Sequence, residues 1–358
     1  MGASASSRSL GARTSSSPRS ATCSGASVVL PHGHTTIGIL YEHPTWFEPL
    51  FAELDRHGLP YDRLLAYKHR FDPAERECPY SLVVNRMSPS AYTRDHAAAI
   101  FYTLEYLAHL KNTGANVVNG YDAYRYEVSK ARQIGLLRRL GLAHPPTRVI
   151  NHPGQAPLAA EALRFPILLK PNIGGSGAKI ARFDTPQELQ RAVDAGALDL
   201  GVDHTALVQE CLPAAGDSIV RVEILNGEFL YAIRLAIVPG EFNLCPSEYC
   251  QPPSEPAGVP TGCLAEPANG SGGLVEPCTP PADVITQVRR IIDAACIDVG
   301  GVEYLVDPRN GEVVYYDINA LSMFVADAVN VVGFDPWPAL VDYLVARAGV
   351  RPAAALRS

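Results

Sequence analysis

The sequence predicts an α/β protein that begins with a parallel-sheet domain and continues into two α+β parts. From Thr35 to about residue 120, apolar strands alternate with amphipathic helices, a pattern that implies a parallel sheet with helices on its faces. Farther along the chain, strands follow one another through glycine-containing turns, which indicates antiparallel hairpins. With 358 residues and 47% hydrophobic content, the chain can form two or three domains with sizeable cores.

The N-terminal part contains strands and helices in regular alternation. We expect strands in TTIGILY, PYDRLLAY, YSLVVNRMS and ANVVNG. We expect helices in PTWFEPLFAELDRHG, which ends at Gly58, and in DHAAAIFYTLEYLAHLKNTG, which ends at Gly114. Ligands of such sheets bind beyond the carboxyl ends of the strands. There Arg86, Ser88 and Arg94 are candidates to bind a substrate carboxylate or phosphate, and surface arginines on a connecting loop are the alternative.

The middle of the chain contains a glycine-rich hairpin. Helical periodicity runs from Tyr121 to Leu140 and stops before two prolines. The stretch FPILLKPNIGGSGAKIARF then predicts two strands joined by a loop, with a helix beginning at Asp184 or Thr185. It lacks the Gly-Lys-Ser/Thr of a Walker loop. The loop glycines permit positive φ and leave backbone N–H groups to face an anion, with Lys170 at the base; an empty hairpin tip is the alternative.

The C-terminal part contains two more hairpins. The first is DSIVRVEILNGEFLYAIRLAIV, which turns at Asn-Gly, and the second pairs VEYLVD with VVYYDIN after the helix ADVITQVRRIIDAACIDVG. Glu303, Asp317 and Asn319 interrupt the apolar strands of the second hairpin, and the last two share one face because they lie two residues apart. Three oxygen ligands on one sheet face suit Mg²⁺. Strand-end polar residues that face solvent are the alternative.

Composition excludes some classes of protein. A net charge of −7 without a basic stripe argues against nucleic-acid binding, and no apolar run is long enough for a membrane span. Residues 1–34 are rich in Ser, Ala, Gly and Arg; a disordered tail is the preferred interpretation over a transit peptide or a start-site error. Residues 239–281 are rich in Pro and Cys and predict a lid or a disordered insert. Free thiols in the cytoplasm are expected for the cysteines, with zinc binding as the alternative.

These motifs, in this order, resemble the ATP-grasp superfamily, particularly carboxylate–amine ligases of the RimK and D-alanine–D-alanine-ligase kind. SKARQIGLLRRLGLAHPPT looks like that family's lysine-bearing helix, LLKPNIGGSG like its phosphate hairpin, VQECLP like its adenine linker and YYDIN like its metal motif. The resemblance covers about residues 120–330. It implies an α/β (α+β ATP-grasp) fold with a tail at 1–34, an N-terminal domain at 35–120, a central subdomain at 121–212 and a C-terminal subdomain at 213–350.

The resemblance also implies roles for individual residues. Contacts to ATP are implied for Lys130, Lys170, Gly174, Gly175, Ser176 and Gly177 at the phosphates, for Gln209, Glu210, Cys211 and Leu212 at the adenine, and for Asp217 at the ribose. Arg221 and Arg234 would face the transferring phosphate and the acyl intermediate, which makes them the catalytic candidates. Glu303, Asp317 and Asn319 would bind one or two Mg²⁺ ions, or Mn²⁺.

The implied reaction is ATP-dependent amide or peptide bond formation between a small-molecule carboxylate and an amine through an acyl phosphate. A kinase acting on a hydroxyl and a non-catalytic ATP-binding protein are the alternatives, and a homodimer stays open. Two departures from the family are visible. Asp317 stands where the family usually has Glu, and NALSMF replaces the usual tail after the asparagine, which puts the substrate side of the site in doubt.

Overall fold

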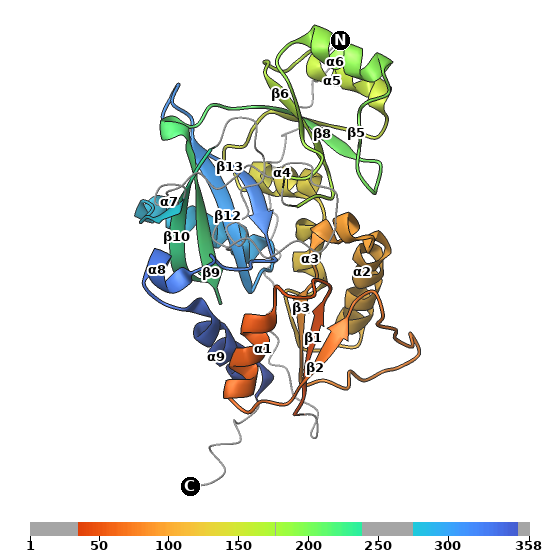
Figure 1. Ribbon diagram of the computed structural model, residues 1–358, viewed down its shortest axis with the longest axis vertical. Helices are drawn as coiled ribbons and strands as arrows, with labels where there is room; N and C mark the ends of the chain where they lie inside the picture. Colours follow the sequence, from red (N-terminus) through yellow and green to blue (C-terminus); the bar gives the residue numbers. More distant parts are fainter. Residues whose placement is uncertain (1–34, 176, 238–274, 350–358) are drawn as a thin grey trace, which may run out of the picture.

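A computed structural model describes residues 35–175, 177–237 and 275–349 of the protein. Three sheets form the body of this part of the chain (Figure 1). One sheet has four strands in the order β2-β1-β3-β4, one has four in the order β5-β8-β6-β7, and one has five in the order β11-β10-β9-β12-β13. The tail at 1–34, Ser176 and residues 238–274 lie outside the described residues, so the expectations for them are not addressed by the structure.

The first sheet is parallel, as the alternation of strands and helices predicts. Its strands are β1 (Ile37–Tyr41), β2 (Tyr61–Leu65), β3 (Leu82–Arg86) and β4 (Val117–Val118). Helix α1 (Glu48–Arg56) packs on one face, and α2 (Ala97–Asn112) packs on the other after the short 3₁₀ helix η1 (Pro89–Arg94). The chain adds β2 on one side of β1 and β3 on the other side, so the direction in which strands are added reverses between β1 and β3. In open α/β sheets this switch point is where ligands bind, so the loops that follow these two strands are placed to form a site.

The helical stretch after the first sheet is broken once, whereas the sequence predicted helical periodicity throughout. It forms α3 (Tyr121–Glu127) and α4 (Lys130–Arg139). Ser129 interrupts the helix because its backbone is extended and its hydroxyl accepts a hydrogen bond from the Arg132 amide at 3.3 Å, as an N-cap does. The break places Lys130 in the first turn of α4.

The second sheet carries the glycine-rich hairpin and is antiparallel. It contains β5 (Thr147–Ile150), β6 (Ile167–Pro171), β7 (Ala181–Phe183) and β8 (Ala206–Glu210). Strands β6 and β7 pair with Ile167 opposite Phe183, which places the glycine-rich loop at their shared end. Thr185 caps α6 (Pro186–Asp194), as the sequence predicts. Strand β5, the 3₁₀ helix η2 (Pro153–Gln155) and helix α5 (Ala156–Ala160) were not predicted, because each is short and weakly patterned.

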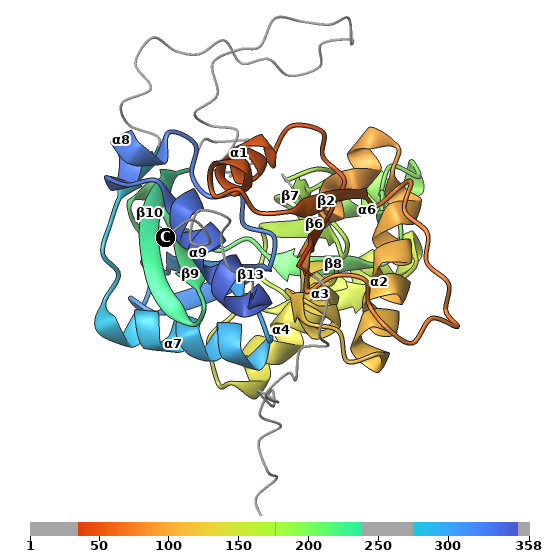
Figure 2. The ribbon, with the colours of Figure 1, turned by 90° about the horizontal axis from the view of Figure 1, so that it is seen from below.

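The third sheet is antiparallel and contains both C-terminal hairpins. Its strands are β9 (Ser218–Leu225), β10 (Glu228–Ala236), β11 (Val275–Pro277), β12 (Val299–Val306) and β13 (Val313–Asn319), preceded by the 3₁₀ helix η3 (Ala215–Asp217). Helix α7 (Ala282–Ala294) covers one face (Figure 2). Strand β11 lies near the end of the stretch 239–281, for which the sequence predicted a lid or a disordered insert, and it pairs with β10.

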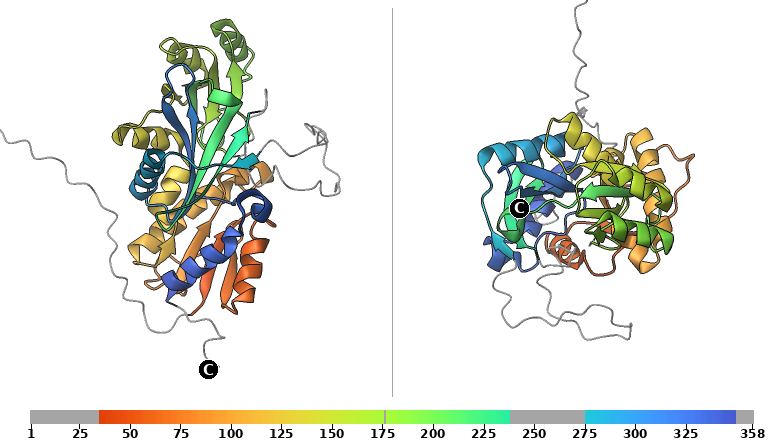
Figure 3. Two further views of the ribbon diagram at one scale, coloured as in Figure 1. Left: turned by 90° about the vertical axis from the view of Figure 1, so that its left-hand side faces the viewer. Right: turned by 90° about the horizontal axis from the view of Figure 1, so that it is seen from above.

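The C-terminal helices return to the start of the chain. Helices α8 (Ala328–Val332) and α9 (Pro336–Ala348) follow the third sheet, and α9 lies beside α1 (Figure 3). Leu340 and Leu344 of α9 share one apolar core with Leu50 and Leu54 of α1. The first and third sheets therefore contribute to a single core, which fixes the loops of one sheet against the strands of the other.

Two further expectations concern membrane spans and cysteines. Within the described ranges, no helix is both long and apolar enough to cross a bilayer. Cys78, Cys211 and Cys278 carry free thiols, as expected for Cys278 of the Pro- and Cys-rich stretch. Cys296, which lies outside that stretch, is disulfide-bonded. Cys245, Cys250 and Cys263 lie outside the described residues.

Candidate functional site

A cavity lies where the three sheets meet, and we call it the central cavity. Its walls are the loops after β1 and β3, the first turn of α4, the glycine-rich loop, the inner face of the third sheet and the loop after β13. The residues that line it are Trp46, Ser88, Pro89, Ser90, Glu127, Lys130, Lys170, Pro171, Gly174, Gly175, Gly177, Ala178, Ile180, Arg221, Glu223, Glu303, Tyr316, Asp317, Asn319, Leu321, Met323 and Phe324.

The glycine-rich loop enters the cavity and is tied to helix α4. Gly177 has a φ of 64°, which glycine adopts without strain. A Cβ on Gly175 would lie 3.1 Å from the Cβ of Ser90, so a larger residue would press on the loop after β3. Asn172 joins the loop to α4, because its side-chain oxygen accepts hydrogen bonds from the Ser129 hydroxyl at 3.1 Å and the Ala131 amide at 3.0 Å. The loop and the first turn of α4 are therefore held together as one unit.

Two lysines lie where the glycine-rich hairpin and the first turn of α4 come together. Lys170 is 6% exposed, and its Nζ lies 3.4 Å from the Gln209 Oε1. Burial, with Lys130 nearby, lowers the pKa of Lys170 to about 8. Lys130 Nζ lies 2.5 Å from the Asp317 carboxylate. Burial opposes the charge of Lys130, but the attraction of Asp317 outweighs it and raises the lysine pKa. The two ammonium groups form a cationic wall suited to phosphate oxygens.

The three candidate metal ligands also face the cavity. Glu303 of β12 stands opposite Asp317 of β13, and a bulge follows at this pair. Burial and then Asp317 raise the pKa of Glu303. Burial would likewise raise the pKa of Asp317, but Lys130 and Lys170 outweigh it and lower that pKa. Two carboxylates that stand opposite each other on paired strands favour a cation between them.

The donor set fits a hard cation such as Mg²⁺. Glu303 and Asp317 offer carboxylate oxygens, and Asn319 points its Nδ2 toward Glu303 at 3.5 Å, which leaves its amide oxygen available. In the part of the chain that the structure describes, no group of three or more His, Cys, Asp or Glu side chains is placed to hold a metal by itself. The two carboxylates and the amide would therefore need phosphate or water oxygens to complete the coordination, as Mg²⁺ usually has.

Arg221 and Glu223 lie on the inner face of β9. Arg221 donates hydrogen bonds from Nε to Glu223 at 2.6 Å and from Nη1 to Glu303 at 3.0 Å. Gly301 of β12 makes room for them, since a Cβ there would lie 2.8 Å from the Glu223 Oε1 and 3.0 Å from the Arg221 Nε. The buried guanidinium thus connects the candidate metal ligands with a further carboxylate.

Arg234 does not reach the central cavity. Directly opposite residues on paired strands share a face, and Arg221 stands opposite Ile233 rather than Arg234. Arg234 therefore points to the other face of the sheet, where it pairs with Glu276 at 3.2 Å and is half exposed. This placement is a correction to the catalytic role expected for Arg234, and its cause is strand alternation.

The expected adenine linker follows strand β8. The Gln209 side chain points toward Lys170, whereas the Glu210 carboxylate accepts a hydrogen bond from the Arg164 amide at 3.0 Å on the other face of β8. The Cys211 amide donates to the Pro166 carbonyl at 2.9 Å, so this donor is already used within the fold. These contacts do not support the roles expected for the Glu210 side chain and the Cys211 N–H. Leu212 is half-buried, and Asp217 is exposed outside the cavity lining.

The loops after β1 and β3 form the remaining wall. Arg86 is fully buried rather than on the surface, and one of its terminal nitrogens donates to the Ser322 carbonyl. Burial lowers the pKa of Arg86 to about 10, despite the nearby Glu223. Its Nε and Nη1 have no hydrogen-bond partner among the described residues. Arg86 therefore anchors the loop after β13 and keeps two donors unused.

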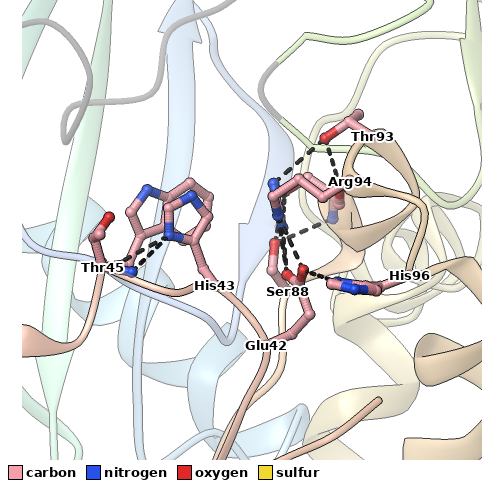
Figure 4. A network of polar contacts seen from close by, with 9 residues as sticks. Glu42, His43, Thr45, Ser88, Thr93, Arg94 and His96 are labelled. Atoms are coloured by element: carbon pink, nitrogen blue, oxygen red, sulfur yellow. Dashed lines mark hydrogen bonds and ion pairs between the residues drawn. The ribbon is translucent and has the colours of Figure 1, made fainter. Parts of the chain in front are cut away.

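Arg94 belongs to a network beside the cavity (Figure 4). The buried Glu42 carboxylate accepts hydrogen bonds from Arg94 Nη2 at 2.6 Å and contacts the His96 ring at 2.5 Å. Burial opposes the charge of Glu42, but the contacts with Arg94 and His96 outweigh it and lower the pKa of Glu42. Arg94 Nη1 lies 3.4 Å from the Ser90 hydroxyl, which contacts the Ser88 hydroxyl at 2.8 Å. Of the three predicted substrate-binding residues, Ser88 lines the cavity directly.

Several cavity residues were not identified from the sequence. Glu127 ends helix α3, and its carboxylate accepts a hydrogen bond from the Leu321 amide at 3.0 Å and another from the Ala320 amide. Burial raises the pKa of Glu127 to about 7. Of these residues, only Glu223 could have been identified from the sequence, because Glu223 and Arg221 are charged residues two apart in an otherwise apolar strand. Nothing in the sequence near Glu127 or Trp46 indicated that they meet at the cavity.

Comparison with known proteins gives a consistent result. Residues 128–245 match the model of the RimK-like ATP-grasp domain. The chain is 25% identical over 227 residues to the carbamoyl phosphate synthase large chain of Thermotoga neapolitana, covering 61% of this chain and 19% of that protein. It is 26% identical over 147 residues to a probable alpha-L-glutamate ligase of Teredinibacter turnerae, covering 41% and 48%. The matched region thus spans no more than about half the length of these curated relatives.

Similarity to solved structures extends over most of the chain. The RimK domain protein ATP-grasp of Sphaerobacter thermophilus superimposes with a TM-score of 0.60 at 15% identity, covering 87% of this chain and 99% of that one. At this identity the likeness concerns the fold alone. It confirms the fold class predicted from the sequence.

Proposed function

Because residues 128–245 match the model of the RimK-like ATP-grasp domain, we propose that the protein is an ATP-dependent carboxylate–amine ligase that works through an acyl phosphate. One observation carries the proposal: a buried lysine, a partly buried lysine, a glycine-rich loop, a buried arginine and three candidate metal ligands all face one cavity. Such a set of side chains is suited to hold a nucleoside triphosphate beside a second anion. Binding two anions together requires cations on several sides.

In this proposal, Lys130 and Lys170 bind the phosphates of ATP together with the backbone of the glycine-rich loop. Glu303, Asp317 and Asn319 would hold Mg²⁺, or Mn²⁺, which neutralises phosphate charge when bound. Gln209 lies beside Lys170 and would contact the nucleotide there. The lysine that now pairs with Asp317 can exchange this contact for a phosphate oxygen.

The proposed reaction has two steps. An oxygen of the substrate carboxylate attacks the γ-phosphorus, and the bond from that phosphorus to the β–γ bridging oxygen breaks, so that ADP leaves. The amine nitrogen then attacks the acyl carbon, the carbon–oxygen bond to phosphate breaks, and phosphate departs with the electron pair while the nitrogen loses a proton. Arg221 faces the cavity between the metal ligands and Glu223, and it would stabilise the negative charge of the acyl phosphate.

The substrates would enter at the wall formed by the first sheet. Ser88 lines the cavity, and Arg94 reaches it through Ser90. The name of the matched glutamate ligase indicates that an amino acid is its substrate. We therefore infer that the product is a small amide or dipeptide.

The deciding experiment measures ADP release with candidate acids and amines supplied singly and together. A ligase requires both substrates, a kinase requires a hydroxyl compound, and a non-catalytic binder releases no ADP with either. Release that depends on acid and amine together supports the proposal, and either other pattern contradicts it.

A further inference from the structure

Glu223 is a buried carboxylate that the proposed catalytic steps leave unused. It is 1% exposed, lies on the inner face of β9 and lines the central cavity. Gly301 stands opposite it on β12, so the glutamate side chain lies against bare backbone. Its position is therefore fixed by the sheet and not by a flexible loop.

The carboxylates of the cavity differ in what they already bind. Asp317 contacts Lys130, Glu303 contacts Arg221, and Glu127 accepts two backbone amides. Glu223 uses Oε1 for Arg221 at 2.6 Å. Its Oε2 is the only carboxylate oxygen of the described ranges that is buried and has no hydrogen-bond partner. The nearby Arg86 makes no hydrogen bond with this oxygen, since its own Nε and Nη1 are also unpaired among the described residues. Because buried polar atoms are normally hydrogen-bonded, a donor from outside the chain is expected at Oε2.

The chemistry of Oε2 restricts that donor. An ionised carboxylate only accepts hydrogen bonds, so the ligand must supply an N–H or O–H group, and a charged donor binds most strongly. Mg²⁺ needs about six oxygen ligands, whereas Glu223 offers one free oxygen beside a guanidinium. A single ammonium group satisfies this oxygen with one hydrogen bond.

The position also suits the second substrate of the reaction. Residues two apart on a strand are separated by roughly 6.6 Å and share a face. Arg221, which would contact the acyl phosphate, and Glu223 are related in this way. A ligand on Glu223 would thus lie next to the acyl group held at Arg221.

We propose that Glu223 recognises the ammonium group of the amine substrate, and that this substrate is a cationic primary amine such as the α-amino group of an amino acid. The inference rests on the proposed ligase function and extends it to the second substrate. Glu223 holds the ammonium ion, which gives one proton to solvent water before its nitrogen attacks the acyl carbon. Loss of the Glu223 charge would weaken the binding of that substrate in particular.

The test compares wild-type protein with Glu223→Gln, Glu223→Asp and the control Glu53→Gln. Glu53 is a matched control because it is also a buried glutamate, 9% exposed and bonded to Arg56, but it lies on α1 away from the cavity. The twenty protein amino acids serve as acid and amine. Hydroxylamine serves as a second nucleophile because it is uncharged near neutral pH and needs no partner for an ammonium group. The measurements are ADP release, hydroxamate formation and the KM for each substrate.

Glu223→Gln should raise the KM for the amine about tenfold to a hundredfold, the range of a lost charge-assisted contact. The KM for ATP and the yield of hydroxamate should stay near wild type, Glu223→Asp should be intermediate and Glu53→Gln unchanged. An unchanged amine KM in an active Glu223→Gln protein overturns this inference alone. Equal loss of hydroxamate and amide formation also overturns it, since Glu223 would then act through Arg221. A raised Mg²⁺ requirement in Glu223→Gln overturns it as well. Wild-type protein that releases no ADP with any pair overturns the ligase function itself.

Discussion

Replacing Lys170 with methionine should make the free protein more stable. The ammonium is buried, and burial together with Lys130 lowers its pKa from 10.5 to about 8. That difference corresponds to roughly 3 kcal/mol of unfavourable free energy for the charge in the folded state. Methionine has a similar length and no charge. We therefore expect the free energy of unfolding without nucleotide to rise by up to about 3 kcal/mol near pH 7.

The same change should weaken nucleotide binding. A charge-assisted hydrogen bond to a phosphate contributes about 1.5–3 kcal/mol, so the Kd for ATP should rise roughly tenfold to a hundredfold. Isothermal titration calorimetry with ATP and Mg²⁺, combined with urea unfolding, measures both effects. Lys179→Met is the matched control, because Lys179 belongs to the same hairpin but is partly exposed and pairs with Asp199 at 2.8 Å. An unchanged ATP affinity in Lys170→Met would refute the phosphate-binding role of the loop.

The pH dependence of stability gives an independent check. Between about pH 8 and 10.5 the unfolded chain keeps the Lys170 proton while the folded protein loses it. Wild-type stability should therefore rise with pH in this window relative to Lys170→Met, since the variant has no proton to lose. A constant difference between the two proteins from pH 7 to 10 would show that the lysine is not desolvated as the structure indicates.

Three further perturbations test other parts of the site. Burial raises the pKa of Glu127 to about 7, so between about pH 4.5 and 7 the folded protein holds this proton while the unfolded chain loses it, and the free energy of unfolding falls as pH rises. In Glu127→Gln, urea unfolding should show a fall in the free energy of unfolding that is smaller by roughly 3 kcal/mol over this range. An identical pH dependence in the two proteins would contradict this. Gly301→Ala should reduce activity at least tenfold, because its Cβ would displace Arg221, whereas Gly135→Ala meets no atom within 4 Å and should stay active. Arg234→Ala should keep wild-type turnover and lose less than about 1 kcal/mol of stability, because its ion pair is exposed; a large fall in turnover would restore the catalytic role.

The sequence was most informative where local chemistry decides the structure. The glycine-rich hairpin, the Asn-Gly turn between β9 and β10 and the cap at Thr185 are set by backbone preferences of the residues themselves, and the structure has them where the sequence placed them. The family resemblance followed from the order of such motifs along the chain. The alternation of Asp317 and Asn319 on one strand likewise predicted that both would share a face.

The tertiary structure decided which side chains meet. Glu127 and Trp46 lie far from the metal motif in sequence, and they join it at the central cavity because the first and third sheets share a core with α9. Arg234 has the residue type expected at the site but lies on the other face of its sheet, since strand register depends on pairing with β9. Whether a segment forms a strand or a turn is decided largely by the residues of that segment. Register, burial and the pairing of charges depend on long-range packing, and a single sequence does not specify these by short patterns.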